Sequence, residues 1–293
     1  MRADYLTNYD PQAVTAVDRY WSTHPVRTRP FATAAASLAF LDWRSAKYPL
    51  FHDLMGLWGE HSRDVVLDYG CGPANDMVGF LVHGKAREVI GADVSTTALD
   101  LARSRLGLHD SDRWRLVKVS DADPSIPIAT ASVDHIYCQG VLHHVSDPAA
   151  ILAEFRRALR PGGTASIMAY SRDSLWVHLY VAWQRQIVEG IDAGLAIERA
   201  FARSTDGDSC PISRAWRPAD FTAMCEAAGF AADYRGGYFN QSELDLWRRE
   251  GRRALADPRL GSEQRDFLAS LRGDPPTYRG LLAGVAGVYW LRR

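Results

Sequence analysis

The segment at residues 65–76 constrains the fold of this chain more than any other, because an apolar run leads through an acid into a Gly-x-Gly turn. Residues 65–67 are apolar throughout, which is typical of a parallel strand buried on both faces of its sheet. Gly70 and Gly72 allow a tight turn that side chains would obstruct. Residues 75–82 predict a helix whose N-terminus directs positive partial charge at the turn. A strand, a glycine turn and a helix in this order predict a socket for a ligand that carries a nucleoside.

Strand-like and helix-like runs alternate on both sides of this turn. The predicted strands cover residues 65–67, 89–92, 114–119, 133–138 and 165–169. The predicted helices between them cover residues 75–82, 96–106 and 148–159. Alternation at this spacing predicts right-handed strand–helix–strand units and a parallel sheet with helices on both faces.

Beyond residue 170 the alternation is interrupted and then resumes. Residues 175–201 predict one long helical stretch, followed by a polar loop. The later predictions are a helix at 219–228, helical residues at 242–272, and strands at 231–236 and 285–291. We therefore expect four parts: a helical cap at 1–62, an α/β core at 63–170, a helical insertion or lid at 171–217, and the C-terminal part of the sheet at 218–293.

The composition narrows the class of protein. The 293 residues carry a formal net charge of -1, so bulk charge provides no field for gathering nucleic acid. The four cysteines are far apart and form no Cys-x-x-Cys pair, so neither a metal site nor a disulfide scaffold is expected. We find no signal peptide and no apolar run of the ~18 residues needed to cross a membrane, so the expected location is the cytoplasm, with no membrane partner.

The identity of the nucleoside ligand depends on two positions near the turn. A dinucleotide fingerprint requires a third glycine, and Asn75 stands there instead. The carboxylate of Asp68, two residues before Gly70, would repel a pyrophosphate but would suit an ammonium group. S-adenosylmethionine (SAM) carries an ammonium and a sulfonium and has no phosphate. SAM is therefore the preferred ligand, and a nicotinamide cofactor is the alternative.

Two further acids follow the next predicted strands. Asp93 ends the second strand, where a carboxylate can accept hydrogen bonds from both ribose hydroxyls. Asp121 follows the third strand and can accept from an adenine amino group, with Asp123 as an alternative. Open parallel sheets bind their ligands at the carboxyl ends of the strands, so we expect these acids to meet at one site.

Five motifs occur in an order and at a spacing that resemble the class I SAM-dependent methyltransferases. They are Asp68-Tyr-Gly-Cys-Gly, Gly91-Ala-Asp-Val-Ser, Asp121-Ala, Asp134-His-Ile-Tyr-Cys-Gln-Gly-Val-Leu-His-His-Val and Leu159-Arg-Pro-Gly-Gly. The resemblance covers residues 65–170. It implies a doubly wound, Rossmann-like sheet of seven strands with the last strand antiparallel.

The resemblance also implies a set of cofactor-binding residues. Gly70 and Gly72 would lie near the methionine part of SAM, and Gln139 near its sulfonium. The remaining contacts implied with the ribose and the adenine are Asp93, Val94, Asp121 and Ala122. Asp68, the acid of the first motif, is the last residue predicted to bind the cofactor.

The candidates for catalysis follow the fourth predicted strand. His143 and His144 lie where the methyl acceptor is expected. One of them could act as a general base, because histidine titrates near neutral pH, and His144 is preferred. The alternative is that both are structural. Cys138 is predicted to be an inert thiol in the core rather than a nucleophile, because it ends a buried strand with no base pattern around it.

The acceptor site is less explicit in the sequence. Asp206 and Asp208 lie in the polar loop after the predicted insertion, where acceptor specificity could be built, although a solvated turn is an equal reading. Tyr20-Trp21 and His24-Pro25 could cover the cofactor, with ordinary aromatic packing as the alternative. Tyr170 completes the candidates for acceptor contact.

We therefore predict methyl transfer from SAM to oxygen, nitrogen or carbon of a small molecule in specialised metabolism, with S-adenosylhomocysteine as product. A protein or RNA acceptor is disfavoured by the neutral charge. Other classes are a SAM-binding protein without methyl transfer and an NAD(P)-dependent oxidoreductase. The oligomeric state stays open, with a homodimer among the alternatives.

Overall fold

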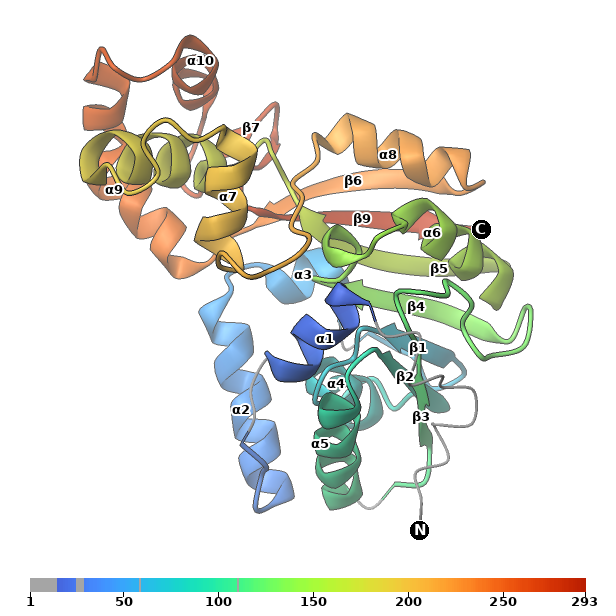
Figure 1. Ribbon diagram of the computed structural model, residues 1–293. Coiled ribbons are helices and arrows are strands. Elements are labelled where there is room, and N and C mark those ends of the chain that lie inside the picture. Colours follow the sequence, from blue (N-terminus) through green and yellow to red (C-terminus); the bar gives the residue numbers. More distant parts are fainter. Residues whose placement is uncertain (1–14, 25–28, 58, 110) are drawn as a thin grey trace.

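A central sheet of seven strands organises the part of the chain that the computed structural model describes, residues 15–24, 29–57, 59–109 and 111–293 (Figure 1). The strand order is β3-β2-β1-β4-β5-β9-β6. The pairs from β3 to β5 are parallel, whereas β9 runs antiparallel to both β5 and β6. This arrangement confirms the predicted fold class, including the antiparallel last strand.

The strands lie close to their predicted positions. Their bounds are β1 (Val65–Tyr69), β2 (Glu88–Asp93), β3 (Trp114–Lys118), β4 (Val133–Gln139), β5 (Leu159–Tyr170), β6 (Ala231–Tyr238) and β9 (Ala286–Arg292). Every residue of β1 is buried, as expected for a central strand covered on both faces. From β1 the chain adds β2 and then β3 on one side of the sheet, and it then returns to place β4 on the other side of β1. This change of direction opens a crevice at the carboxyl ends of β1 and β4, where sheets of this kind bind ligands.

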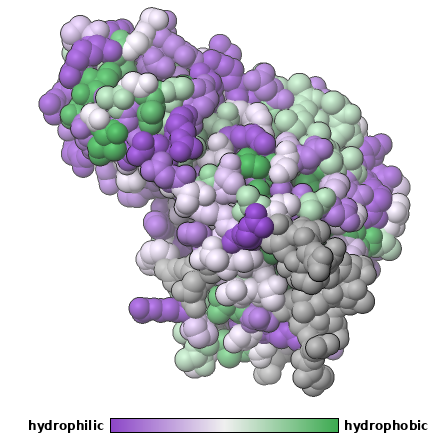
Figure 2. All heavy atoms as spheres, viewed as in Figure 1, coloured by the Kyte–Doolittle hydropathy of each residue, from purple (hydrophilic) through white to green (hydrophobic). Residues whose placement is uncertain are grey.

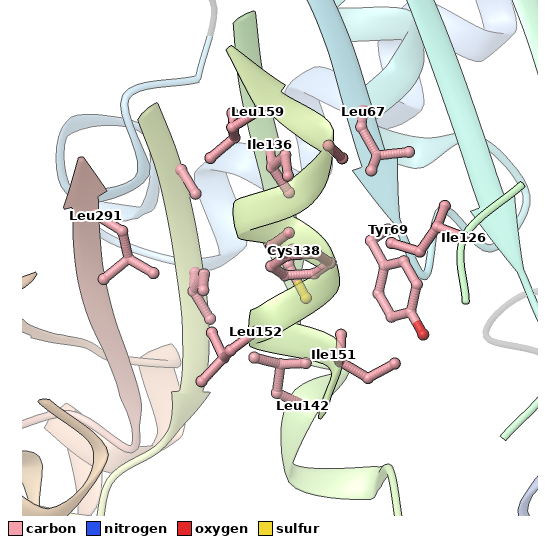
Figure 3. Close-up of a cluster of buried hydrophobic side chains, with 14 of the residues drawn as sticks. Leu67, Tyr69, Ile126, Ile136, Cys138, Leu142, Ile151, Leu152, Leu159 and Leu291 are labelled. Carbon is pink, nitrogen blue, oxygen red and sulfur yellow. The ribbon is translucent and has the colours of Figure 1, made fainter. Parts of the chain in front are cut away.

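Helices cover both faces of the sheet (Figure 1). One face packs against α4 (Asn75–Val82) and α5 (Thr96–Leu106), and the other against α6 (Pro148–Ala158) and α8 (Pro218–Ala227). Figure 3 shows the core on the face that α6 and α8 cover, in which Cys138 of β4 lies among Leu142, Ile151 and Leu152. Burial raises the pKa of the Cys138 thiol well above its usual value, so this thiol is an unreactive part of the core.

In the described residues before β1, the structure has three further helices: α1 (Ala16–Thr23), α2 (Ala34–Lys47) and α3 (Phe51–Met55). Residues 1–14, 25–28 and 58 of the predicted cap lie outside the described residues. Helix α3 is attached to the sheet, because the Trp290 ring N–H on β9 donates to the Leu54 carbonyl oxygen at 2.7 Å. Helix α1 lies across the carboxyl edge of the sheet, beside α5 (Figure 1).

The insertion and part of the C-terminal region form a lobe beside the sheet (Figure 1). It contains η4 (Trp176–Glu189), α7 (Ile197–Thr205), α9 (Gln241–Ala256), α10 (Ser262–Ser270) and the hairpin of β7 (Thr277–Tyr278) and β8 (Leu281–Leu282). Apolar side chains of η4, α9 and α10 share one core. Hydrophilic residues cover most of the lobe, around a group of hydrophobic ones (Figure 2).

The single helical stretch predicted at 175–201 is two helices in the structure. Helix η4 has π-helical hydrogen bonding and ends at Gly190, whose φ of 69° is in the left-handed region that favours glycine. The helical residues predicted at 242–272 are likewise split into α9 and α10. No helix in the described residues is long and apolar enough to cross a membrane.

Candidate functional site

A cavity of about 320 Å³ opens at the carboxyl edge of the sheet. Its walls come from the turn after β1, the ends of β2, β4 and β5, helices α1 and α2, and the loop after α7. Nine predicted site residues line it: Gly70, Gly72, Asp93, Val94, Asp121, Gln139, His144, Tyr170 and Asp206. The other predicted residues, Asp68, Ala122, His143, Tyr20 and Asp208, lie outside its wall.

The glycine turn is attached to the neighbouring strand. The backbone N–H groups of Gly70 and Cys71 both donate to the Ala92 carbonyl oxygen, at 2.7 and 3.0 Å. Gly70 has φ +77°, and a Cβ atom there would lie 2.1 Å from Cγ2 of Val141. Gly72 also has a positive φ, but a Cβ atom there would meet nothing within 4 Å. Gly70 is therefore required by the packing of the turn, whereas Gly72 borders open space in the cavity.

Asp93 holds the second half of this turn. Its Oδ2 accepts the Gly72 N–H at 2.8 Å, and its Oδ1 accepts the Ser95 N–H at 2.8 Å. Burial raises the pKa of the Asp93 carboxyl, and these two backbone hydrogen bonds oppose the shift. The carboxyl group also lines the cavity beside Val94, so it can meet a ligand while it positions the turn.

Asp121 is held by the loop that follows η3 (Leu142–His144). Its carboxylate accepts the Ser146 N–H at 2.7 Å and the Ser146 hydroxyl at 2.5 Å. The next residue, Ala122, is exposed and does not line the cavity. The alternative acid, Asp123, accepts the Ser125 N–H and also lies outside the wall.

Asp68 is buried next to the cavity wall but does not form part of it. Only 2% of the residue is exposed, and its Oδ2 has no hydrogen-bond partner. Burial raises the pKa of the Asp68 carboxyl well above its usual value, and the nearby Asp76 and Asp93 raise it further. The acid that faces the cavity after the glycine turn is Asp76.

Arg44 of α2 joins this acid to the end of β4. Its guanidinium donates to the carboxylate of Asp76 and to the side-chain oxygen of Gln139. The Gln139 amide donates in turn to the Tyr238 hydroxyl at 2.8 Å. Arg44 and Asp76 thus present a cation and an anion side by side on the wall, which suits a zwitterionic amino-acid group. No local pattern in the sequence indicates Arg44, because its partners follow more than thirty residues later.

His144 has a defined tautomer. Its Nδ1 lies 2.7 Å from the Ile212 carbonyl oxygen, which can only accept, so Nδ1 carries the hydrogen and Nε2 has the free lone pair. Nε2 lies 3.6 Å from Oδ1 of Asp206. Burial lowers the pKa of His144, while Asp206 opposes the shift, so the ring is neutral and can accept a proton at Nε2.

His143 points away from the cavity and supports Tyr170. The two rings are stacked with centroids 3.7 Å apart, and Nδ1 of His143 accepts the Tyr170 N–H at 3.3 Å. His143 is fully buried, and this burial lowers its pKa well below the usual value. Of the two predicted histidines, His144 is therefore the one that a ligand can reach.

Asp206 connects several parts of the cavity wall near His144. Its Oδ1 accepts the Tyr170 hydroxyl at 3.2 Å and its Oδ2 accepts the Ser213 hydroxyl at 2.6 Å. Its backbone carbonyl accepts the Tyr20 hydroxyl at 2.7 Å, so Tyr20 attaches α1 to this loop without lining the cavity. Asp208 is exposed and pairs with Arg203 at 2.8 Å.

Helix α1 contributes two lining residues: Trp21, which was expected to cover the cofactor, and Val17, which no pattern in the sequence indicated. Val17 and Trp21 lie four positions apart, on one face of the helix, and both reach the cavity. The Trp21 ring lies 4.7 Å from that of His144. No group of three or more His, Cys, Asp or Glu residues among those described could hold a metal ion.

Part of this chain is similar in sequence to known proteins. The family described as "Methyltransferase domain" matches residues 67–167. A malonyl-[acyl-carrier protein] O-methyltransferase from Yersinia pestis is 33% identical over 134 residues, which cover 46% of this chain and 46% of that protein. An uncharacterized 37.1 kDa protein in transposon TN4556 of Streptomyces fradiae is 34% identical over 145 residues, which cover 47% of this chain and 40% of that protein.

The fold is also found among solved structures. The crystal structure of a SAM-dependent methyltransferase from Mesorhizobium loti has a TM-score of 0.52 and 19% identity, covering 83% of this chain and 97% of that one. At this identity the likeness concerns the fold alone. This chain spans less than half the length of the two relatives above, 40% and 46%.

Proposed function

Because the chain contains a domain of the class I SAM-dependent methyltransferases, whose cofactor is SAM, we propose that it transfers the SAM methyl group to a small-molecule acceptor. The observation that carries the proposal is one cavity with two chemically different ends. The glycine turn and Asp93 border one end, and His144, Tyr170 and Asp206 border the other. A donor and an acceptor can therefore meet inside it.

The first end suits the parts of SAM. The Asp93 carboxyl is assigned to the ribose hydroxyls, and Asp121 to the adenine amino group, since both are acceptors on the wall. Gly72 leaves room for the methionine chain to approach the backbone. Arg44 and Asp76 are assigned to the carboxylate and the ammonium of the amino-acid group.

Methyl transfer is an in-line displacement, so positioning can supply much of the acceleration, on the order of 7–11 kcal/mol. Gln139 ends β4 within the wall and is assigned a place beside the sulfonium. His144 is assigned as general base, because its Nε2 is the basic nitrogen that lines the cavity. Trp21 and Val17 line the site and are assigned the role of excluding water from it.

The acceptor is proposed to be a small molecule of specialised metabolism. The relative from Yersinia pestis is named for a carrier-protein substrate. In this chain α1 and the loop after α7 meet over the acceptor end through the Tyr20 hydroxyl, which favours an acceptor enclosed by the cavity.

Calorimetric titration with SAM, followed by detection of S-adenosylhomocysteine, tests the proposal. SAM should bind and NAD should not. Replacing Asp93 by alanine should weaken SAM binding by roughly 10- to 100-fold, because a hydrogen bond to a charged group contributes about 1.5–3 kcal/mol. The matched control is Asp233→Ala, an exposed acid on β6.

Two outcomes would contradict the proposal. NAD binding without SAM binding would favour the oxidoreductase alternative. SAM binding without S-adenosylhomocysteine formation from any acceptor would indicate a protein that binds SAM but transfers no methyl group.

A further inference from the structure

Asp206 is a buried acid whose polar contacts supply no fixed positive charge. Its side chain is 9% exposed. The two hydroxyls that donate to it, from Tyr170 and Ser213, are neutral. Within the described residues, its one ion-pair contact is with His144, whose ring is neutral for the reasons given above. Burying a carboxylate without a cation costs free energy, so a cationic ligand would stabilise this end of the cavity.

Asp206 and His144 together present two hydrogen-bond acceptors at the cavity wall. Oδ1 of Asp206 is an acceptor, and Nε2 of His144 is also an acceptor because its Nδ1 holds the hydrogen. The two atoms are 3.6 Å apart, and both residues line the cavity, so a ligand group beside them can meet both atoms. A ligand group with two or more N–H hydrogens could donate to both atoms at once.

Two aromatic rings lie near this pair of acceptors. Trp21 and Tyr170 both line the cavity beside His144, with ring centroids 4.7 and 5.9 Å from the His144 ring. Aromatic faces attract cations, and more strongly when water is excluded. Among the described residues that line the cavity, the one lysine or arginine is Arg44, which pairs with Asp76 on α4.

Two further charged or titratable neighbours of His144 lie outside the cavity wall. Arg214 faces the ring and helps to lower its pKa, but its guanidinium donates to the Val145 carbonyl oxygen at 2.6 Å, and the ion-pair contact of Asp206 in the described residues is with His144 instead. The Cys210 thiol lies 3.8 Å from Nδ1, on the side away from the lone pair.

We propose that the methyl acceptor is an amine, bound as its ammonium ion between Asp206, His144 and the rings of Trp21 and Tyr170. This inference rests on the proposed methyl transfer and narrows its substrate class. A hydroxyl acceptor fits the same place less well, because the carboxylate would repel the oxyanion that forms as the hydroxyl loses its proton.

The reaction then balances without any further reactant. The ammonium gives one proton to Nε2 of His144, and the nitrogen lone pair that this frees forms a bond to the methyl carbon of SAM. The carbon–sulfur bond breaks and its electron pair stays on sulfur, which leaves neutral S-adenosylhomocysteine. The product is the N-methylated ammonium, and Asp206 stabilises the imidazolium until its proton is released to water.

Matched acceptor pairs test the substrate class directly. The probes are phenethylamine with 2-phenylethanol, and hexylamine with 1-hexanol, titrated calorimetrically into the full chain saturated with S-adenosylhomocysteine. Each pair differs only in the charged or neutral head group. We expect at least one amine to bind about tenfold or more tightly than its alcohol.

Variants test whether Asp206 causes the preference for the amine over the alcohol. Asp206→Asn should reduce the amine-to-alcohol ratio to about threefold or less while leaving affinity for S-adenosylhomocysteine unchanged, and this second affinity reports that the variant is folded. The exposed control Asp233→Asn should keep the full preference. Equal binding of amine and alcohol in every pair, absence of amine binding, or a preference that survives Asp206→Asn would each overturn the proposal.

These outcomes are separable from those of the proposed function. If the amine binds through Asp206 but no S-adenosylhomocysteine forms from SAM, the amine site is supported and methyl transfer is not. If the protein binds no SAM, the same titrations on the protein alone still decide whether Asp206 selects an amine.

Discussion

Gly70 and Gly72 belong to the same turn but are required for different reasons, and this difference can be measured. A methyl group at position 70 would collide with Val141, whereas one at position 72 would enter open space. Gly70→Ala should lower the free energy of unfolding by roughly 2–4 kcal/mol through overpacking and the positive φ. Gly72→Ala should lower it by only about 1–2 kcal/mol, yet weaken SAM binding by about tenfold or more.

Urea unfolding and SAM titration of the two variants, side by side with the wild type, check this prediction. Unchanged SAM affinity in Gly72→Ala would mean that the cofactor does not approach this part of the turn. Equal loss of stability in both variants would mean that Val141 can move aside.

Two acids near this turn show the limit of a local pattern. The order of residues predicted that Asp68 meets the ligand, and the structure instead has Asp76 on the cavity wall, with Asp68 buried next to the wall. A sequence states which residues are neighbours along the chain, but not which side of a strand end faces the crevice. Arg44 was missed for a related reason, because it reaches the site from a helix that precedes β1.

Helix α1 is joined to both ends of the cavity by single side chains. Asp18 accepts the Asp121 N–H at 3.0 Å and the Ser120 hydroxyl at 2.8 Å, beside the assigned adenine site. Tyr20 donates to the carbonyl of Asp206 at the acceptor end. The helix has eight residues and is capped by Thr15, so it depends on these contacts to stay in place.

Asp18→Ala should therefore release α1 without unfolding the sheet. Each lost hydrogen bond contributes about 1 kcal/mol, which is enough to favour local opening. We expect the SAM dissociation rate, measured by stopped flow, to rise by about tenfold or more, while the melting temperature falls by only a few degrees. The control on the same helix is Ser22→Ala, which removes a bond to the Asp18 carbonyl within the helix. An unchanged dissociation rate in Asp18→Ala would show that α1 does not retain the cofactor.

Helices that begin at a clear signal, either a capping side chain or a glycine turn, were the most predictable parts of the chain. The bounds of α4 and α5 agree with the predicted 75–82 and 96–106, since Ser95 caps α5 and the glycine turn precedes α4. The break at Gly190 was not predicted, because an isolated glycine also occurs inside helices. The cavity wall formed by α1 depends on contacts across more than a hundred residues, which no local pattern encodes.

Buried histidines link the stability of the whole fold to pH. Burial lowers the pKa of His135 to about 3 and that of His178 to about 4, and it lowers that of His143 as well. In the unfolded chain each ring binds a proton near pH 6.5, so the unfolded state holds more protons below that pH. The free energy of unfolding should then fall as pH decreases from about 6.5, by roughly 1.4 kcal/mol per pH unit for each ring, down to its folded pKa.

Urea unfolding at pH 7.5 and pH 5.5 checks this dependence. His178→Leu keeps an apolar contact with Phe267, against which the ring is stacked at 4.1 Å, and should make the dependence shallower. His83→Gln, at an exposed position, should leave it unchanged. If the free energy of unfolding depends equally on pH in the wild type and in both variants, His178 takes up protons equally in the folded and unfolded states.

The position of β9 has a consequence for how the chain emerges from the ribosome. This strand is the last in the described chain, yet it lies between β5 and β6, and its Trp290 holds α3. Residues up to β5 can form a parallel sheet during translation, but the edge of β5 stays open until residues 286–292 arrive. Until then β6 has no partner in the seven-stranded sheet and α3 lacks the Trp290 contact, although both were made earlier. Vectorial synthesis thus delivers the strand that completes the sheet after all of its neighbours.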